Sequence, residues 1–295
     1  MKKTSAAAIA LIVLAAMTLV SLMWPSWRDP ANPGNSAWLA QLAWSVVAVS
    51  LIVFLMAISA GITKRPFGFL INERNLMSLT RFQTVLWTVI ILSAYFVVAL
   101  ARVVLNVPEP LVIKVDPQLW ALLGISLTSL VGSSMINSNK TNKKPDNQEI
   151  TKTMNALAAN NNLPAAAMAA AAATPVAANQ PDPRANVIFQ HKQGSLYANP
   201  SMDDASLSDM FEGDEIGNAA YLDLAKVQMF FFNIIVALSY IALLLSETMQ
   251  KLASDPGNVS ALPLLSKGMI ALLGISHAGH LMGKTADRTK LQGQA

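Results

Sequence analysis

The sequence predicts an all-α membrane protein with six transmembrane helices, in which helices 3–4 and helices 5–6 are copies of one helical hairpin. Three observations predict this fold. Hydrophobic residues make up 53% of the chain and charged residues only 13%, about half the share found in soluble domains. Six apolar stretches are each long enough to cross a bilayer core of about 30 Å as a helix. Finally, one pair of these stretches repeats another.

The expected transmembrane helices lie near residues 5–24, 38–62, 82–102, 117–136, 227–246 and 264–283. The first of them also has the basic start and apolar run of a signal peptide. However, the run up to Trp24 is long for a signal peptide, and no small-residue cleavage site follows it. We therefore expect the first helix to be retained.

The distribution of basic residues predicts the topology. With a cytoplasmic amino terminus and six crossings, only five of the 21 Lys and Arg residues fall outside, and the remaining 16 fall inside. Such an excess of inner basic residues is the usual orientation signal of membrane proteins. We therefore expect a multi-pass protein of the bacterial inner membrane with both termini in the cytoplasm. The five outer residues are Arg28, Arg102, Lys114, Lys251 and Lys267.

The internal repeat runs from about 68–134 to about 213–284. The run Ala-Leu-Leu-Gly-Ile-Ser at 121–126 returns letter for letter at 271–276, a shift of 150. Such self-similarity indicates tandem duplication of a two-helix unit. At a shift of 145, the matched pairs are Gly68 and Gly213, Leu79 and Leu224, Arg81 and Lys226, Gln83 and Gln228, Trp87 and Phe232, and Tyr95 and Tyr240.

These features divide the chain into five parts. The tether is expected to be flexible because it is rich in Ala, Asn and Pro, most of all over residues 139–185. The parts are an N-terminal transmembrane hairpin (1–62), the first hairpin repeat (63–136), a cytoplasmic tether (137–202), an acidic cytoplasmic segment with the second repeat (203–285), and a cytoplasmic tail (286–295).

The acidic segment contains seven acidic residues and no basic residue between Asp203 and Asp223. Large apolar residues alternate with them, so we expect an ordered element that docks against residues 64–81. The basic residues of that connection, Lys64, Arg65, Arg74 and Arg81, complement the carboxylates in charge. Exposed ion pairs contribute only ~0–1 kcal/mol each, so docking should depend mainly on burial of the apolar members Met210, Phe211, Tyr221 and Leu222. The candidate residues for docking a partner are Asp209, Phe211, Glu212, Asp214 and Glu215.

Two groups of residues are candidates for helix packing inside the membrane. Amide side chains at the edge of the hydrocarbon need partners on neighbouring helices, and small residues let helix backbones approach closely. The amides are Gln83, Gln228 and Asn233, and the small residues are Gly124, Gly132, Gly274, Gly279 and Gly283.

One pattern resembles that of rhomboid-like intramembrane serine proteases. These place a serine on the fourth helix and a histidine on the sixth, as Ser126 and His277 or His280 are placed here. Leu127, however, stands where a small residue is expected, and the repeat explains Gly-Ile-Ser without chemistry. The two histidines lack a third ligand and the chain has no cysteine, so no metal site and no cofactor is expected.

The segments Ser78–Gln83 with Trp87-Thr88, Asp223–Gln228, and both Ala-Leu-Leu-Gly-Ile-Ser runs resemble those of a family of bacterial integral membrane proteins built on this duplicated hairpin. The family has no established activity. The resemblance covers about residues 67–136 and 205–285, and it implies the boundaries of the two repeats.

The sequence favours a non-enzymatic anchor or scaffold subunit of the inner membrane, within an oligomeric or multi-protein assembly. Its expected partners are the lipid bilayer and either copies of itself or other membrane or cytoplasmic proteins, and not nucleic acid. Charged residues cluster at the helix ends, which disfavours ion-coupled transport. The alternatives are a homo-oligomeric pore and the rhomboid-like protease.

Overall fold

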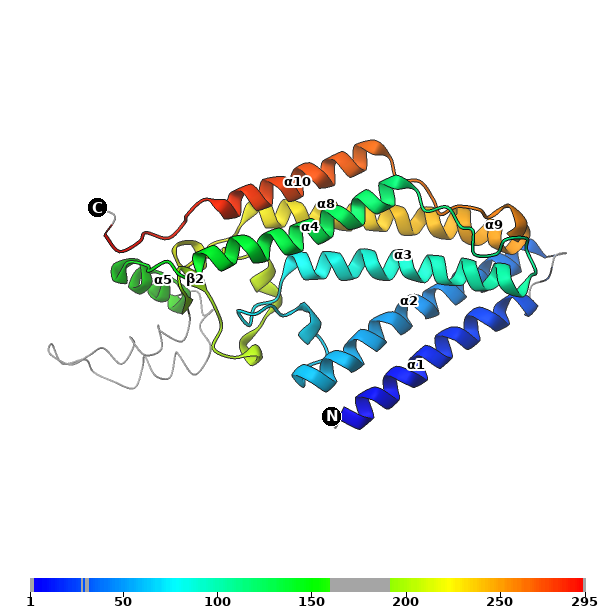
Figure 1. The fold of residues 1–295 in the computed structure, drawn as a ribbon, viewed down its shortest axis with the longest axis horizontal. Coiled ribbons are helices and arrows are strands. Elements are labelled where there is room, and N and C mark those ends of the chain that lie inside the picture. The colour runs from blue at the N-terminus through cyan, green and yellow to red at the C-terminus, as the bar shows by residue number, and fades with distance from the viewer. Residues whose placement is uncertain (1–2, 28, 30–31, 160–191, 294–295) are drawn as a thin grey trace. The chain divides into compact units, whose positions relative to one another are not determined.

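The computed structural model describes residues 3–27, 29, 32–159 and 192–293, which are mostly helical (Figure 1). The alanine-rich tract of the predicted tether and His191 lie outside the described residues. The described helices are α1 (Lys3–Met23), α2 (Pro33–Thr63), α3 (Leu79–Val104), α4 (Pro117–Lys140), α5 (Asn147–Ala159), α8 (Leu224–Leu243), α9 (Met249–Ser254) and α10 (Lys267–Thr285), and β1 (Lys192–Gln193) pairs antiparallel with β2 (Leu196–Tyr197).

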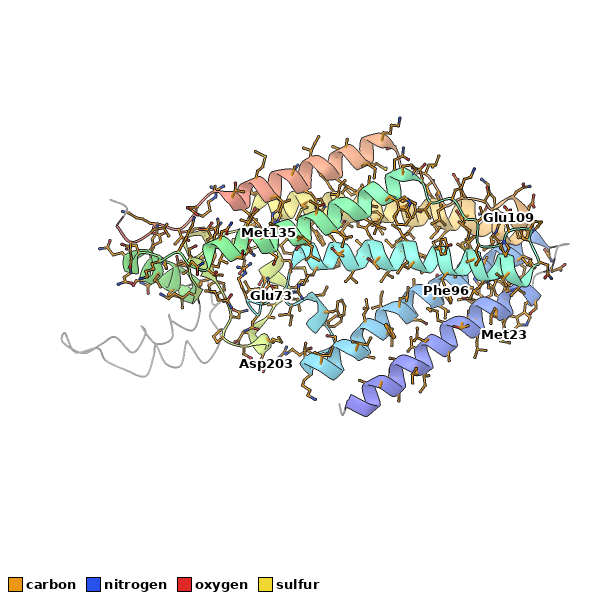
Figure 2. All side chains as sticks on the ribbon, in the orientation of Figure 1. Met23, Glu73, Phe96, Glu109, Met135 and Asp203 are labelled. Carbon is orange, nitrogen blue, oxygen red and sulfur yellow. The ribbon has the colours of Figure 1, made fainter. Side chains whose placement is uncertain are left out.

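Five helical segments are long and apolar enough to cross a membrane, namely Ser5–Trp27, Asn35–Thr63, Leu79–Val104, Pro117–Lys140 and Leu224–Ser254. Apolar side chains surround these helices, and many of them, such as Met135 on α4, are exposed (Figure 2). An exposed apolar surface of this extent suits contact with lipid. Helix α10 is not among the five, because its small and polar residues lower its hydropathy.

The chain forms two compact units, and the first comprises Met1–Phe69, Phe82–Leu127 and Phe231–Gly274. It contains the antiparallel hairpin of α1 and α2 (Figure 1). The largest side chains of its core include Trp24, Trp87 and Tyr240, all at most 2% exposed. The rings of Trp87 and Tyr240 meet edge to face with centroids 6.2 Å apart, an arrangement that aromatic pairs prefer.

Helix α8 continues through a π-helical turn, Leu244–Thr248, into α9. The sequence predicts that this helix ends near residue 246, just before Glu247. The observed helix continues to Ser254, shortly before Pro256. A π-helical turn shifts the backbone ladder and leaves a carbonyl to be satisfied elsewhere. The Gln41 amide of α2 donates to the Leu245 carbonyl at 3.1 Å, which anchors α2 at this turn.

The second unit comprises Leu70–Arg81, Thr128–Phe230 and Ile275–Ala295. Its small core joins Leu76, Leu157, Tyr197 and Ala219, which come from four distant parts of the chain. The predicted tether therefore includes regular structure at both of its ends, namely α5 and the β1–β2 hairpin. The middle of the tether lies among the residues that are not described.

The two predicted repeats begin their helices at matching positions. Helices α3 and α8 start at Leu79 and Leu224, a shift of 145, and α4 and α10 start at Pro117 and Lys267, a shift of 150. Side chains accept from the first helical turn in both copies. The Ser78 hydroxyl accepts from the Arg81 N–H (3.5 Å), and the Asp223 carboxylate accepts from the Ala225 N–H (3.0 Å).

The loop before each helix corrects one predicted match. The Asn72 N–H donates to the Leu76 carbonyl (2.9 Å), and the Gly213 N–H donates to the Tyr221 carbonyl (3.1 Å). Leu76 and Tyr221 are 145 positions apart, so Gly213 corresponds in bonding to Asn72 and not to Gly68. The loop that begins at Gly213 spans eight positions from donor to acceptor, and the loop that begins at Asn72 spans four.

Candidate functional site

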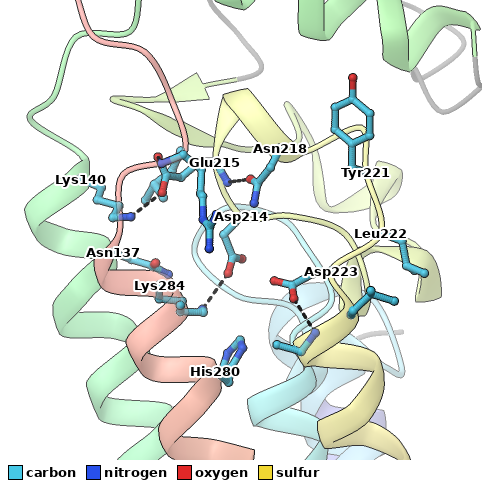
Figure 3. Close-up of a pocket in the computed structure, with 15 residues that line it drawn as sticks. Asn137, Lys140, Asp214, Glu215, Asn218, Tyr221, Leu222, Asp223, His280 and Lys284 are labelled. Carbon is cyan, nitrogen blue, oxygen red and sulfur yellow. Dashed lines mark hydrogen bonds and ion pairs between the residues drawn. The ribbon is translucent and has the colours of Figure 1, made fainter. Parts of the chain in front are cut away.

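The strongest cluster of ionisable groups in the second unit surrounds Asp214. Its carboxylate lies 2.6 Å from Arg74 Nη2, 3.0 Å from Lys284 Nζ and 3.3 Å from Lys226 Nζ. All four side chains are buried or nearly so, with exposed fractions of 14% for Asp214 and 5%, 12% and 6% for Arg74, Lys284 and Lys226. Figure 3 shows Asp214 and Lys284 pointing toward each other. The loop at 70–81, the start of α8 and the end of α10 thus each contribute one cation to the same carboxylate.

The cations determine the ionisation of Asp214. Burial alone would raise the pKa of this carboxyl, but Lys226, Lys284 and Arg74 hold its pKa well below the ordinary value. Asp214 therefore stays ionised, and three cations face one anion. Within this group of four side chains, positive charge exceeds negative charge, and all four are largely buried.

A second buried ion pair lies beside the first. Lys140 at the end of α4 donates to the Glu215 carboxylate and to the Ala286 carbonyl (2.7 Å). Glu215 also accepts from the backbone N–H groups of Arg288 (3.0 Å) and Thr289 (3.1 Å). Glu215 therefore fixes the chain that follows α10 to the end of α4.

The loop at 70–81 contacts the acidic segment directly, as the sequence predicts for part of 64–81. Arg74 Nη1 donates to the carbonyls of Tyr197 (3.0 Å) and Asp214 (2.8 Å). The Met77 N–H donates to Asp209 at 3.0 Å. The Arg74 and Asp214 side chains make these contacts while largely buried, whereas the sequence predicts exposed ion pairs.

The expected apolar contribution to this contact is only partly correct. Met210 is buried, and the Phe211 ring packs edge to face on Phe230 with centroids 5.2 Å apart. Tyr221 and Leu222, however, are exposed by 58% and 61%. They lie on the loop that begins at Gly213. This loop is four positions longer than the loop that begins at Asn72, and the additional positions carry these side chains outward.

The remaining predicted docking residues also have partners inside the chain. Asp209 caps the turn at Ser206, which it contacts through both side-chain oxygens. The Glu212 carbonyl accepts from Lys226. Burial raises the pKa of both the Asp209 and Glu212 carboxyls. A partner-docking role for the five predicted residues stays a prediction. Most of their polar atoms already bind other parts of the same chain.

A pocket of about 400 Å³ lies beside the ion cluster, at the end of α10 and the start of α8 (Figure 3). Both charge signs line it, together with amides and apolar side chains. The residues that matter most for its chemistry are Asn137, Asn218, Leu222, His280, Lys284 and Arg288.

The predicted amides differ in their surroundings. The Asn233 carbonyl oxygen accepts from the Trp87 indole N–H at 3.1 Å, and both side chains are fully buried. Gln83 is also fully buried, but its amide has no hydrogen-bond partner among the described residues. Gln228 is exposed. Only Asn233 joins helices in the way expected.

The predicted small residues divide in the same manner. An added Cβ at Gly132 would lie 3.4 Å from Leu281, and one at Gly274 would lie 3.7 Å from Ile125. Within the described chain, an added Cβ at Gly124, Gly279 or Gly283 would meet nothing within 4 Å. These three glycines are therefore open to lipid or to another molecule.

The candidate protease residues are buried, as Ser126, His277 and His280 have at most 3% exposure. Ser126 belongs to the first unit and both histidines belong to the second, so the protease alternative stays a prediction. No group of three His, Asp or Glu side chains in the described residues could hold a metal ion.

We expect Asn233→Ala to destabilise the first unit by about 1–2 kcal/mol, because the buried Trp87 indole N–H would lose its acceptor. Unfolding in mild detergent, followed by tryptophan fluorescence, measures the change. Gln228→Ala, at an exposed amide of the same helix, is the matched control and should change stability little. Equal effects of both substitutions would contradict the role of the Trp87–Asn233 bond.

No family model, no curated protein and no solved structure matches this chain. The class of protein shown is a mostly helical chain with five helices able to cross a membrane.

Sequence reasoning placed Arg74 opposite the carboxylates of the acidic segment, but it missed the three lysines of the candidate site. It interpreted Lys140, Lys226 and Lys284 as topology signals at the helix ends. Their burial was not visible, because lysine and arginine near helix ends usually extend toward water. The one available signal in the sequence was a run of carboxylates with no basic residue among them. These carboxylates have to find their cations outside the run.

Proposed function

We propose that the protein is a non-enzymatic anchor or scaffold subunit of the bacterial inner membrane. One observation carries the proposal. Charged side chains of the described spans lie near the helix ends, as Lys140 and Lys226 do, where they bind other parts of the same chain. Such groups stabilise a fold, whereas carriers place ionisable groups along a path through the bundle.

The open glycine Gly279 on α10 supports assembly with another membrane helix. Its neighbours Ile275 and Met282 are both 72% exposed. A small residue beside large exposed apolar ones allows close approach of a second helix in a bilayer.

In this proposal α10 is the sixth crossing and both termini lie in the cytoplasm. The matching starts of α4 and α10 support the sixth crossing, since they favour equivalent roles in a duplicated hairpin. The excess of basic residues on one side supports the orientation. Labelling of a cysteine placed at Gln193 from outside intact cells would contradict it.

We expect Gly279→Ile to weaken assembly at least several-fold without unfolding the chain, because the added side chain meets open space within the chain but blocks a close helix contact. Chemical cross-linking in native membranes, followed by size analysis in mild detergent, measures assembly. Ala278→Ile adds similar bulk at the adjacent exposed position and is the matched control.

A wild-type chain that stays a 31.5 kDa monomer in native membranes, with no cross-linked partner, would contradict the scaffold proposal. Conductance of the purified protein in planar bilayers would instead favour the homo-oligomeric pore. Labelling by a fluorophosphonate that is lost in Ser126→Ala would favour the protease.

A further inference from the structure

The cluster around Asp214 has more positive than negative charge. Arg74, Lys226 and Lys284 share this single carboxylate, and all three cations are at most 12% exposed. Burial of charge without compensation is unfavourable, and a nearby anion relieves it. The structure thus contains a place where an additional anion would be stabilised.

The pocket gives such an anion access to the cluster. Lys284 lines it, and its ammonium group has three donors but one carboxylate partner, Asp214, among the described residues. Arg288 lines it too, with an exposed side chain that makes no ion pair within the described chain. Two cationic groups can therefore donate into the pocket.

The carboxylates that line the pocket are already engaged. Glu215 accepts from Lys140 and from two backbone N–H groups. Asp223 caps α8 and accepts from the N–H groups of Ala225 (3.0 Å) and Lys226 (3.3 Å). Both carboxylates therefore already have hydrogen-bond donors inside the chain, and Lys284 and Arg288 are the cationic side chains that we assign to a ligand.

One rim of the pocket is apolar and exposed. Leu222 and Leu224 are exposed by 61% and 73%, and they stand where α8 begins its apolar run. In the proposed topology this is the cytoplasmic interface, where basic pockets between helices bind the headgroups of anionic lipids. An anionic head beside an apolar chain would match both walls.

We propose that this pocket binds a phosphate group, held by Lys284 and Arg288, with the headgroup of an anionic phospholipid as its source. A planar guanidinium and an ammonium together suit the several oxygens of a phosphodiester. The inference goes beyond the scaffold role and does not depend on it. A soluble phosphate ester has the same recognised chemistry and is tested beside the lipid.

The test uses the purified full chain in mild detergent and counts bound lipid by native mass spectrometry. Phosphatidylglycerol is compared with phosphatidylcholine, and inorganic phosphate and glycerol phosphate are the soluble probes. Thermal shift is read for all four. We expect one phosphatidylglycerol per chain, held in preference to phosphatidylcholine. Arg288→Gln should weaken its binding about tenfold, because one charge-assisted contact is lost.

Lys290→Gln is the matched control, since it removes one charge from the same tail at an exposed residue that does not line the pocket. It should leave binding within about twofold, the range expected for screened surface charge. Arg288→Gln should keep the wild-type melting temperature. Lys284→Gln, checked in the same way, should weaken binding at least as much.

The outcomes separate the ligand sources. Stabilisation by inorganic phosphate or glycerol phosphate equal to that by phosphatidylglycerol would support the site and assign it to a soluble phosphate. Absence of binding by all the phosphate probes would overturn the proposal. Equal weakening by Arg288→Gln and Lys290→Gln would also overturn it, since binding would then follow the net charge of the tail.

Discussion

Asp214→Asn should destabilise the second unit by about 3–5 kcal/mol, the usual cost when one partner of a buried ion pair is removed. The substitution preserves size and leaves Arg74, Lys226 and Lys284 buried beside a neutral amide. Three mutually repelling cations then lack the anion that holds them together. Hydrogen exchange of the full chain in mild detergent measures the loss in amides of residues 70–81 and 192–223.

Asp203→Asn is the matched control, because Asp203 is an exposed member of the same acidic segment. It should alter exchange by a few tenths of a kcal/mol at most. Lys284→Gln combined with Asp214→Asn should recover part of the lost stability, because one of the three repelling charges disappears. An effect of Asp214→Asn no larger than that of Asp203→Asn would show that the cluster does not stabilise the unit.

The same cluster predicts a dependence on acid. The pKa of Asp214 is lower in the folded chain than in the unfolded chain, so its contribution is present above the unfolded value of about 3.9. The contribution is lost as the pH falls through the folded pKa. Burial raises the pKa of Asp209 and Glu212, so their protonation as the pH falls acts in the opposite direction. Comparison with Asp214→Asn isolates the loss that belongs to Asp214.

The helices could be predicted from sequence because an apolar run of 20 residues has few alternatives in a membrane protein. The observed starts at Leu79 and Leu224 even preserve the shift of 145 found in the letters. The end of the continuous helix formed by α8, the π-helical turn and α9 was missed, since Glu247 resembles a loop residue. The chain places Glu247 in a π-helical turn, and the helix continues to Ser254.

The sequence placed Arg74 on the loop that faces the carboxylates, but the individual ion pairs could not be predicted in the same way. Arg74 and Asp214 are 140 positions apart, and Lys140 and Glu215 are 75 apart. Local pattern sets which face of a helix is apolar, but it contains no information on which distant cation meets which anion. The exposed pair Tyr221 and Leu222 was misjudged for a related reason. Their hydrophobicity predicted burial, whereas the length of their loop placed them outside.

Arg102→Met should destabilise the first unit by about 3 kcal/mol, the second largest effect expected here. Arg102, at the end of α3, is 4% exposed and contacts no carboxylate among the described residues. Its guanidinium instead donates to the carbonyls of Pro110 (3.1 Å), Glu109 (3.3 Å), Pro108 (3.4 Å) and Val259. Hydrogen bonds from a charged donor contribute about 1.5–3 kcal/mol, and buried acceptors left without one add to the loss.

These bonds join the loop after α3 to the loop before α10, where the backbone N–H of Lys114 also donates to the Ser260 carbonyl at 2.7 Å. Methionine retains most of the apolar stem of Arg102 but none of its donors, so the substitution isolates the polar contribution. Arg81→Met is the matched control at the other end of the same helix. Arg81 is 29% exposed, its partner Glu73 is 76% exposed, and the loss there should stay below about 1 kcal/mol. Thermal unfolding in mild detergent compares the two variants, and equal losses would mean that the Arg102 bonds do not hold the loops together.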